Sequence, residues 1–174
     1  MQPALAPELQ PAVTLLEKTP AVLETLLLSA PPNVLDWKPS PERWAIREVL
    51  AHLVDIEKLF MERVRRILEE DTPHLPKFTP NGLLLGGPSA DAIERLARFG
   101  TLRNELSGLL KGAPASAASR IGVHEELGRV TLAQLVNELA NHDLGHLRQI
   151  AELYRARAFY PNAGPFQKYS DPRP

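Results

Sequence analysis

Residues 131–150, TLAQLVNELANHDLGHLRQI, are the stretch of sequence that decides the fold. Thr131 and Gln134 have the spacing of a capping box, in which each side chain accepts a hydrogen bond from the backbone of the other residue at the start of a helix. Apolar residues then recur every three or four positions, which is typical of an amphipathic helix with one buried face. The pattern predicts a helix that begins at Thr131 and continues to about Ala156.

The same period appears in three earlier segments, at about 11–29, 45–70 and 89–110. Proline should interrupt the first of them at Thr19-Pro20, because it lacks a backbone donor and clashes with the preceding turn. Alternatively, Thr19 could cap a fresh helix in which Pro20 is the first residue. Four long amphipathic helices with no strong strand signal predict an all-α fold, a four-helix bundle.

Three connecting segments carry the turn-forming residues. Residues 72–88 hold four prolines and three glycines, which predicts a long loop over one mouth of the bundle. Residues 121–124 and 128–130 are consistent with a small turn or hairpin, and the tail after Phe159 is expected to lie across the bundle. We expect the 72–88 loop, the 112–130 segment and the tail to form the mouth of any functional site, since specificity is usually determined by such loops.

The composition is that of one globular domain spanning residues 1–174, with 44% hydrophobic and 24% charged residues. The 20 basic and 21 acidic residues give a net charge of −1, without runs of like charge. We therefore expect no nucleic-acid partner and no membrane partner. The chain has no cysteine, which excludes disulfides and thiolate ligands, and no N-terminal secretion signal is recognisable. These features predict a cytoplasmic protein.

Three histidines in the predicted helices are the candidate functional residues. His142 and His146 are four residues apart, so they lie one turn apart on the same face of the last helix. On a helical wheel they fall about 60° and 20° from the centre of its apolar stripe. His52 lies at the flank of the stripe of the second helix. If the two helices are neighbours, the three imidazoles can bind a divalent metal ion and leave a coordination position open for water or substrate.

The other ring nitrogen of each histidine then needs its own partner. Glu48, Asp55, Glu138 and Gln149 lie within about a turn of the histidines and are the candidates. A simpler alternative is that the three rings are solvated or hydrogen-bond only to one another. His74 is expected at the surface, and the turn-like surroundings of His124 favour a structural or mouth-lining role over metal binding. The His-Glu-x-x-His motif of zinc proteases and the Glu-x-x-His motif of di-iron bundles are both absent from the sequence.

Three stretches resemble the DinB-like superfamily, which includes the YfiT-type metal-dependent hydrolases and thiol-dependent transferases. They are residues 44–57 (WAIREVLAHLVDIE), 122–128 (GVHEELG) and 142–150 (HDLGHLRQI). The resemblance covers nearly the whole chain and implies a four-helix bundle. It also implies a divalent metal, with nickel, zinc and iron all known in the family, bound by His52, His142 and His146. One departure is Ala45, where the family often has a serine or threonine cap.

The function implied by the resemblance is that of a metal-dependent hydrolase acting on a small-molecule substrate. We expect a metal-bound water, rather than a side chain, to be the nucleophile. The open position could instead hold a low-molecular-weight thiol as its thiolate, for S-transfer or isomerisation. A third alternative is a metal-binding bundle without catalysis that acts as a homodimer. Because ligand imidazoles must be neutral, metal binding is expected to weaken below about pH 6.

Overall fold

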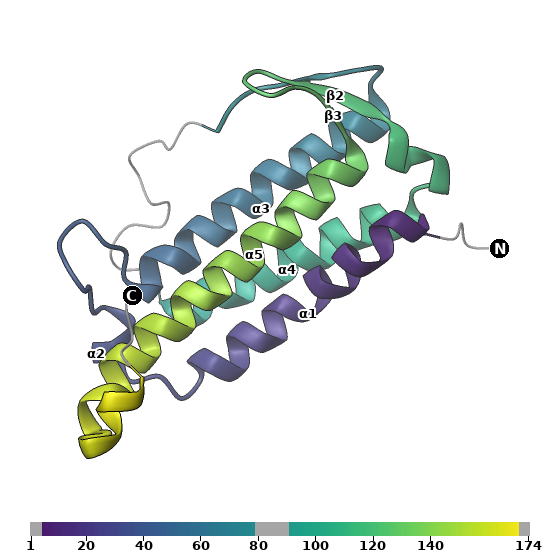
Figure 1. Ribbon diagram of the computed structural model, residues 1–174. Helices are drawn as coiled ribbons and strands as arrows, with labels where there is room; N and C mark the ends of the chain where they lie inside the picture. Colours follow the sequence, from purple (N-terminus) through teal and green to yellow (C-terminus); the bar gives the residue numbers. More distant parts are fainter. Residues whose placement is uncertain (1–4, 79–90, 171–174) are drawn as a thin grey trace.

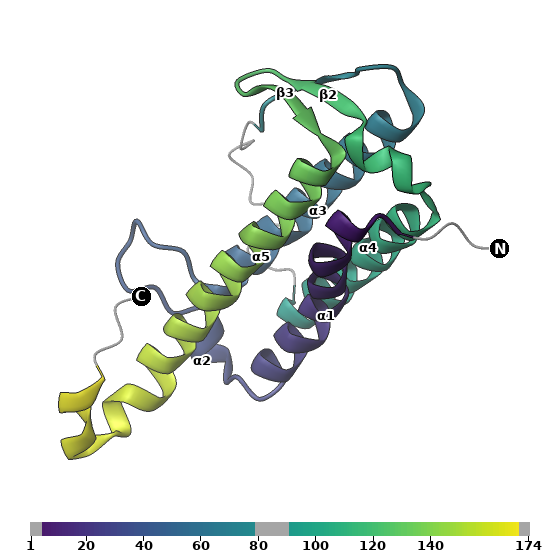
Figure 2. The same cartoon turned by 45° about the vertical axis from the view of Figure 1, so that its right-hand side comes forward.

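Four long helices form most of the computed structural model, which describes residues 5–78 and 91–170 (Figure 1). They are α1 (Gln10–Leu27), α3 (Ile46–Glu69), α4 (Ala92–Gly112) and α5 (Leu132–Tyr154). Both α1 and α3 pack against α4 and against α5, so α1 and α3 lie diagonally across the bundle from each other (Figures 1 and 2). The predicted all-α four-helix bundle is confirmed, and α3 and α5 are neighbours.

The apolar stripes of the four helices meet in one core. Each helix contributes side chains with almost no exposed surface, such as Leu16, Val49, Leu106 and Leu139. Removing this apolar surface from water is the main favourable contribution to folding. The positions agree with the helical period of the sequence, and they fix which face of α3 and of α5 points toward the bundle interior.

A small sheet covers the end of the bundle where α3 ends and α5 begins (Figures 1 and 2). The predicted hairpin is confirmed as β2 (Ile121–His124) and β3 (Gly128–Thr131), which pair in antiparallel fashion. A two-residue strand, β1 (His74–Leu75), pairs parallel to β2 and was not predicted. Glycine is required at position 122, because a Cβ there would lie 2.6 Å from Leu75 Cδ1. Residues 79–88 of the predicted loop lie outside the described residues.

Helix α1 continues through Pro20, so the predicted interruption at Thr19-Pro20 is wrong. Proline leaves the carbonyl of Leu16 without its usual intrahelical donor. A buried side chain replaces that donor: Arg103 Nη1 of α4 donates to the Leu16 carbonyl at 2.9 Å. Thr19 does not cap a new helix, since its hydroxyl donates to the Leu15 carbonyl one turn back.

The start of α5 is as predicted, because Thr131 and Gln134 form the reciprocal bonds of a capping box at 3.1 and 2.9 Å. At its other end a π-helical turn, Arg155–Phe159, continues from α5. Two 3-10 turns follow (Tyr160–Asn162 and Gly164–Tyr169), beyond the end of the bundle opposite the sheet (Figures 1 and 2). The prediction that the tail lies across the bundle is therefore wrong for residues 160–170, because the π turn carries the chain onward past the bundle.

The remaining boundaries differ from the predictions by a few residues. A short helix, α2 (Pro32–Leu35), and two 3-10 turns, Pro7–Leu9 and Ala115–Ser119, complete the described elements. Helix α4 begins after Asp91, whose carboxylate accepts from the Ile93 amide. None of the described helices is long and apolar enough to cross a membrane.

Candidate metal centre

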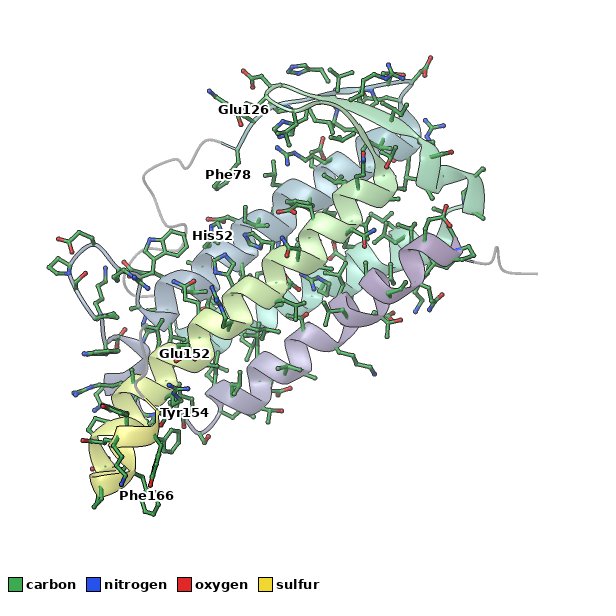
Figure 3. All side chains as sticks on the ribbon, viewed as in Figure 1. His52, Phe78, Glu126, Glu152, Tyr154 and Phe166 are labelled. Atoms are coloured by element: carbon green, nitrogen blue, oxygen red, sulfur yellow. The ribbon has the colours of Figure 1, made fainter. Side chains whose placement is uncertain are left out.

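The three candidate histidines meet at the contact between α3 and α5. His52 Nε2 lies 3.0 Å from His142 Nε2, and His146 Nε2 lies 3.2 Å from the same atom. One nitrogen from each ring lies within 4.8 Å of the other two. His52 faces α5 in Figure 3, and all three rings are partly buried. The bundle therefore brings together residues that are 90 positions apart in the sequence.

The surroundings favour the neutral form of His52 and of His142. Burial, together with the neighbouring rings of His146 and His142, lowers the pKa of His52 to about 4. Burial likewise lowers the pKa of His142 to about 4, with a further contribution from His146. A neutral ring has a lone pair on one nitrogen, and this is the form that binds metals.

The arrangement fits a divalent ion better than it fits a hydrogen-bonded set. Metal–nitrogen bonds of about 2.0–2.1 Å in tetrahedral geometry place the ligand nitrogens about 3.3 Å apart. The two close Nε2 pairs, at 3.0 and 3.2 Å, are near that spacing. Without an ion, His142 Nε2 offers either one N–H or one lone pair, so it can make one well-formed hydrogen bond but not two. An ion would accept all three lone pairs at once.

Two aromatic residues enclose the histidine cluster. The ring of Trp44, just before α3, is 4.9 Å from the His52 ring, centroid to centroid, and stacks on the His146 ring at 6.3 Å. Phe78 meets His52 edge-on at 6.1 Å (Figure 3). These contacts hold the rings in place and shield part of the site from water. Neither aromatic residue was among the predicted site residues.

Of the four polar residues predicted to support the histidines, Gln149 makes a hydrogen bond to one. Its Oε1 lies 2.8 Å from His146 Nδ1, so that nitrogen carries the proton and Nε2 is left free to bind a metal. Glu48 instead caps α3: its carboxylate accepts from the Ala45 amide and from Lys38 Nζ. This explains how α3 begins at a residue that cannot cap it with its own side chain.

The two other carboxylates also have neighbours of their own. Asp55 Oδ1 lies 3.7 Å from Lys58 Nζ, and Glu138 accepts from Asn141 Nδ2 at 3.4 Å. Glu138 nevertheless lines the cavity next to the histidines. The Nδ1 atom of His142 is buried and has no hydrogen-bond partner among residues 5–78 and 91–170. The favourable polar interactions of this ring are thus confined to Nε2.

A cavity of about 810 Å³ opens beside His142 and His146. Its volume is in the range of small-molecule sites. Gly145 lies between the two histidines on its floor, where a Cβ would meet no atom within 4 Å. The charged and amide side chains around it are Arg43, Glu138, Arg148, Gln149, Glu152 and Arg155.

The other two histidines in the described residues lie away from this cluster. His74 is exposed in β1, as predicted. His124 is buried in β2, where its Nδ1 accepts from the backbone amides of Glu126 and Leu127 and its Nε2 lies 3.1 Å from Arg63 Nη2. Burial lowers the pKa of His124. These contacts are typical of a structural residue, which is one of the two roles predicted from its turn-like surroundings.

A second polar cluster, beside the first, was not predicted. Arg103 of α4 is fully buried and pairs with Glu57 of α3 at 2.7 Å and with Asp143 of α5 at 2.6 Å. We call these three residues the ion triad. Burial raises the pKa of Glu57, although its bond to Arg103 acts in the opposite direction. With its bond to Leu16, Arg103 connects all four long helices.

A four-helix bundle with three converging histidines on two neighbouring helices defines a class of helical proteins with a candidate metal centre. This chain belongs to the DinB superfamily, whose family model matches residues 15–150 and so includes all three histidines. It is similar to the uncharacterized protein YuaE of Bacillus subtilis, with 24% identity over 133 residues, covering 68% of this chain and 82% of YuaE.

Among solved structures, the bundle is similar to that of YfiT from Bacillus subtilis, with a TM-score of 0.77 and 24% identity. The match covers 84% of this chain and 86% of YfiT, which is described as a probable metal-dependent hydrolase with an unusual four-helix bundle topology. At this level of identity the likeness establishes the fold.

Proposed function

We propose that this protein is a metal-dependent hydrolase of a small molecule, in which His52, His142 and His146 bind one divalent ion. The observation that carries the proposal is the convergence of three imidazole nitrogens beside an open cavity of about 810 Å³. The description of the structurally similar YfiT as a probable metal-dependent hydrolase supports it. Nickel, zinc and iron are the candidate ions, because all three accept imidazole ligands.

Bound by three neutral ligands, such an ion keeps its double charge and an open position, with which it polarises a substrate and activates water near neutral pH. The residues around it have separate tasks. Gln149 holds the proton of His146 on Nδ1, which keeps Nε2 available. Trp44 and Phe78 fix the His52 ring and limit water on that side. Glu138 and Glu152 line the cavity and are the carboxylates able to accept a proton there.

The first test is the metal content of the purified protein, measured by elemental mass spectrometry without added metal. We expect about one ion per chain in the wild type and loss of that ion in His142→Ala. His74→Ala is the matched control, because it removes an exposed histidine outside the cluster and should leave the metal content unchanged. Absence of metal from the wild type, after reconstitution with nickel, zinc or iron has also failed, would overturn the proposal.

The second test separates the catalytic alternatives. Metal-loaded protein is assayed against ester, amide and phosphoester panels, with and without glutathione as a low-molecular-weight thiol. Hydrolysis without thiol that is lost in His52→Ala supports the hydrolase. Turnover only in the presence of thiol would replace it with an S-transferase or isomerase. Bound metal without any turnover would favour a non-catalytic metal-binding bundle. Analytical ultracentrifugation would then test whether that bundle assembles as a homodimer.

A further inference from the structure

The cavity beside the histidines has an uneven distribution of charge. Three arginines and two glutamates line it, and one pair partly neutralises itself, since Arg155 Nη2 lies 3.5 Å from Glu152 Oε2. Arg43 and Arg148 have no side-chain hydrogen bond or salt bridge among residues 5–78 and 91–170. Glu138, which accepts from Asn141, is the remaining acid of the lining. The cavity thus has a surplus of cationic groups without a partner.

The charged groups that α5 and its continuation contribute are separated along the cavity, with the arginines toward one end and Glu138 toward the other. Arg148 of α5 and Arg155, the first residue of the π-helical turn that continues α5, are seven residues apart, so they lie on one face toward the C-terminal end of the helix. Glu138 lies on the other side of the two histidines, toward the N-terminal end. Figure 3 shows Glu152 near the end of α5, well beyond His52 along the bundle. Arg43 reaches the same cavity from the segment that precedes α3.

Space for a ligand lies at Gly145, next to the histidines in the same cavity as the arginines. Gly145 has no side chain on the cavity floor, and a Cβ there would meet no atom within 4 Å. A guanidinium group recognises carboxylate and phosphate oxygens through its fixed fork of N–H donors. Two such groups without internal partners, next to an open floor, are suited to an anionic ligand.

We propose that this cavity binds a small organic anion whose carboxylate or phosphate group is held by Arg43 and Arg148 while the rest of the molecule lies over Gly145 beside the histidines. The proposal rests on the proposed function, because it assigns the substrate class of the same site. It also makes a claim that does not require the metal: the arginines should bind the anionic group in the metal-free protein.

The test measures binding to metal-free protein by isothermal titration calorimetry at low ionic strength. The probes are glutarate, phenyl phosphate and the neutral glutaramide, which matches glutarate in size. We expect at least one anion to bind at least about tenfold more tightly than glutaramide, as loss of a charge-assisted bond implies. Stronger binding of glutarate would identify a carboxylate as the recognised group, and stronger binding of phenyl phosphate would identify a phosphate.

Two sets of variants locate the binding. Arg43→Gln/Arg148→Gln should weaken the preferred anion about tenfold or more, whereas Arg98→Gln, an exposed arginine of α4 outside the cavity, should not. Gly145→Ala should raise the thermal midpoint by about 2–4 °C yet weaken anion binding. Gly108→Ala in α4, which also meets no atom within 4 Å, should raise the midpoint alone.

Equal affinity for glutarate, phenyl phosphate and glutaramide, or anion binding unchanged in the double arginine variant, would overturn the proposal. The metal content of the wild type is measured separately, before the metal is removed and after reconstitution with nickel, zinc or iron. Anion binding by a protein that holds no metal in either state would preserve this inference and refute the hydrolase. Bound metal without arginine-dependent anion binding would preserve the proposed metal site and refute the anion-binding inference. The failure of one proposal can therefore be distinguished from the failure of the other.

Discussion

His142 and Asp143 are neighbours in α5, yet they belong to two polar clusters of opposite character. Asp143 is part of the ion triad, in which one guanidinium pairs with two carboxylates and each of the three side chains is at most 1% exposed. His142 is part of the histidine cluster, where three imidazole rings face one another and the buried Nδ1 of His142 has no partner in the described residues. The ion triad satisfies its own polar groups, whereas the histidine cluster brings together ring nitrogens that could bind an ion.

The two clusters differ in whether the protein itself satisfies their buried polar groups. Burial is costly for a polar atom unless it is hydrogen-bonded, and more so for a charge. The triad meets that requirement within the protein and adds a bond to the Leu16 carbonyl, which Pro20 leaves free. The histidine cluster does not meet it, and it opens on a cavity. We therefore interpret the triad as structural and the histidines as a binding site.

The largest expected effect comes from breaking the triad. Arg103→Met leaves two buried carboxylates without a counter-charge and the Leu16 carbonyl without a donor, so the free energy of unfolding should fall by about 3–5 kcal/mol. Urea denaturation followed by circular dichroism measures this loss. Arg98→Met, at an exposed position of the same helix, is the control and should change stability by less than about 0.5 kcal/mol. A loss below about 1 kcal/mol in Arg103→Met would show that the triad is not a stabilising unit.

An intermediate effect is expected from acid on the metal-free histidine cluster. The pKa of His52 and of His142 is about 4 in the folded protein, mainly because of burial. In the unfolded chain it is about 6.5. Between these values the unfolded chain binds more protons, so the free energy of unfolding should decrease as the pH falls from about 6.5 to about 4. The lowered pKa also moves the loss of metal binding to lower pH than the sequence alone suggested.

The measurement is the difference in unfolding free energy between wild type and His52→Leu/His142→Leu, across that pH range and without metal. Subtraction matters because the raised pKa of Glu57 has the opposite effect, stabilising the folded state as the pH falls. We expect the difference to shift by about 2 kcal/mol, after a reduction for the partial exposure of the rings. A difference that does not vary with pH would mean that the rings are not held neutral by burial.

The smallest effect should follow from Pro20→Ala. Replacing a proline in a helix interior usually stabilises by about 3 kcal/mol, because a donor is restored and a clash is removed. Here Arg103 already supplies the donor, so we expect a gain below about 1 kcal/mol. In the Arg103→Met background the same change should gain more, and a double-mutant cycle by urea denaturation gives the coupling. Equal gains in both backgrounds would contradict the replacement of one donor by the other.

The parts of the structure that depend on local spacing could be predicted from the sequence. His142 and His146 share a face because they are four residues apart, and Thr131 with Gln134 defines the start of α5. Helical period placed His52 beside a buried stripe, and the family resemblance identified it as the partner of the other two. These features could be predicted because each follows from the geometry of a single helix.

The rest depends on contacts between segments that are distant in the sequence. Nothing close to Pro20 shows that an arginine of another helix will satisfy the carbonyl it leaves free. Arg103 and Asp143 lie within the apolar stripes of their helices. Opposite charges at such positions indicate a buried ion pair, so this pattern could have predicted part of the triad. The direction of the tail depends on a π turn for which the sequence around Arg155 contains no proline or glycine signal.

The ion triad also has a consequence for how the chain folds. Arg103 binds partners that are 46, 40 and 87 residues away, on three other helices. A partly assembled bundle that lacked α3 or α5 would bury the guanidinium with only one of its carboxylates, and one without α1 would leave no carbonyl in place. No subset of the long helices can complete this set of bonds. The side chain thus favours all-or-none assembly, and such long-range contacts make folding slower than that of a bundle held by local contacts alone.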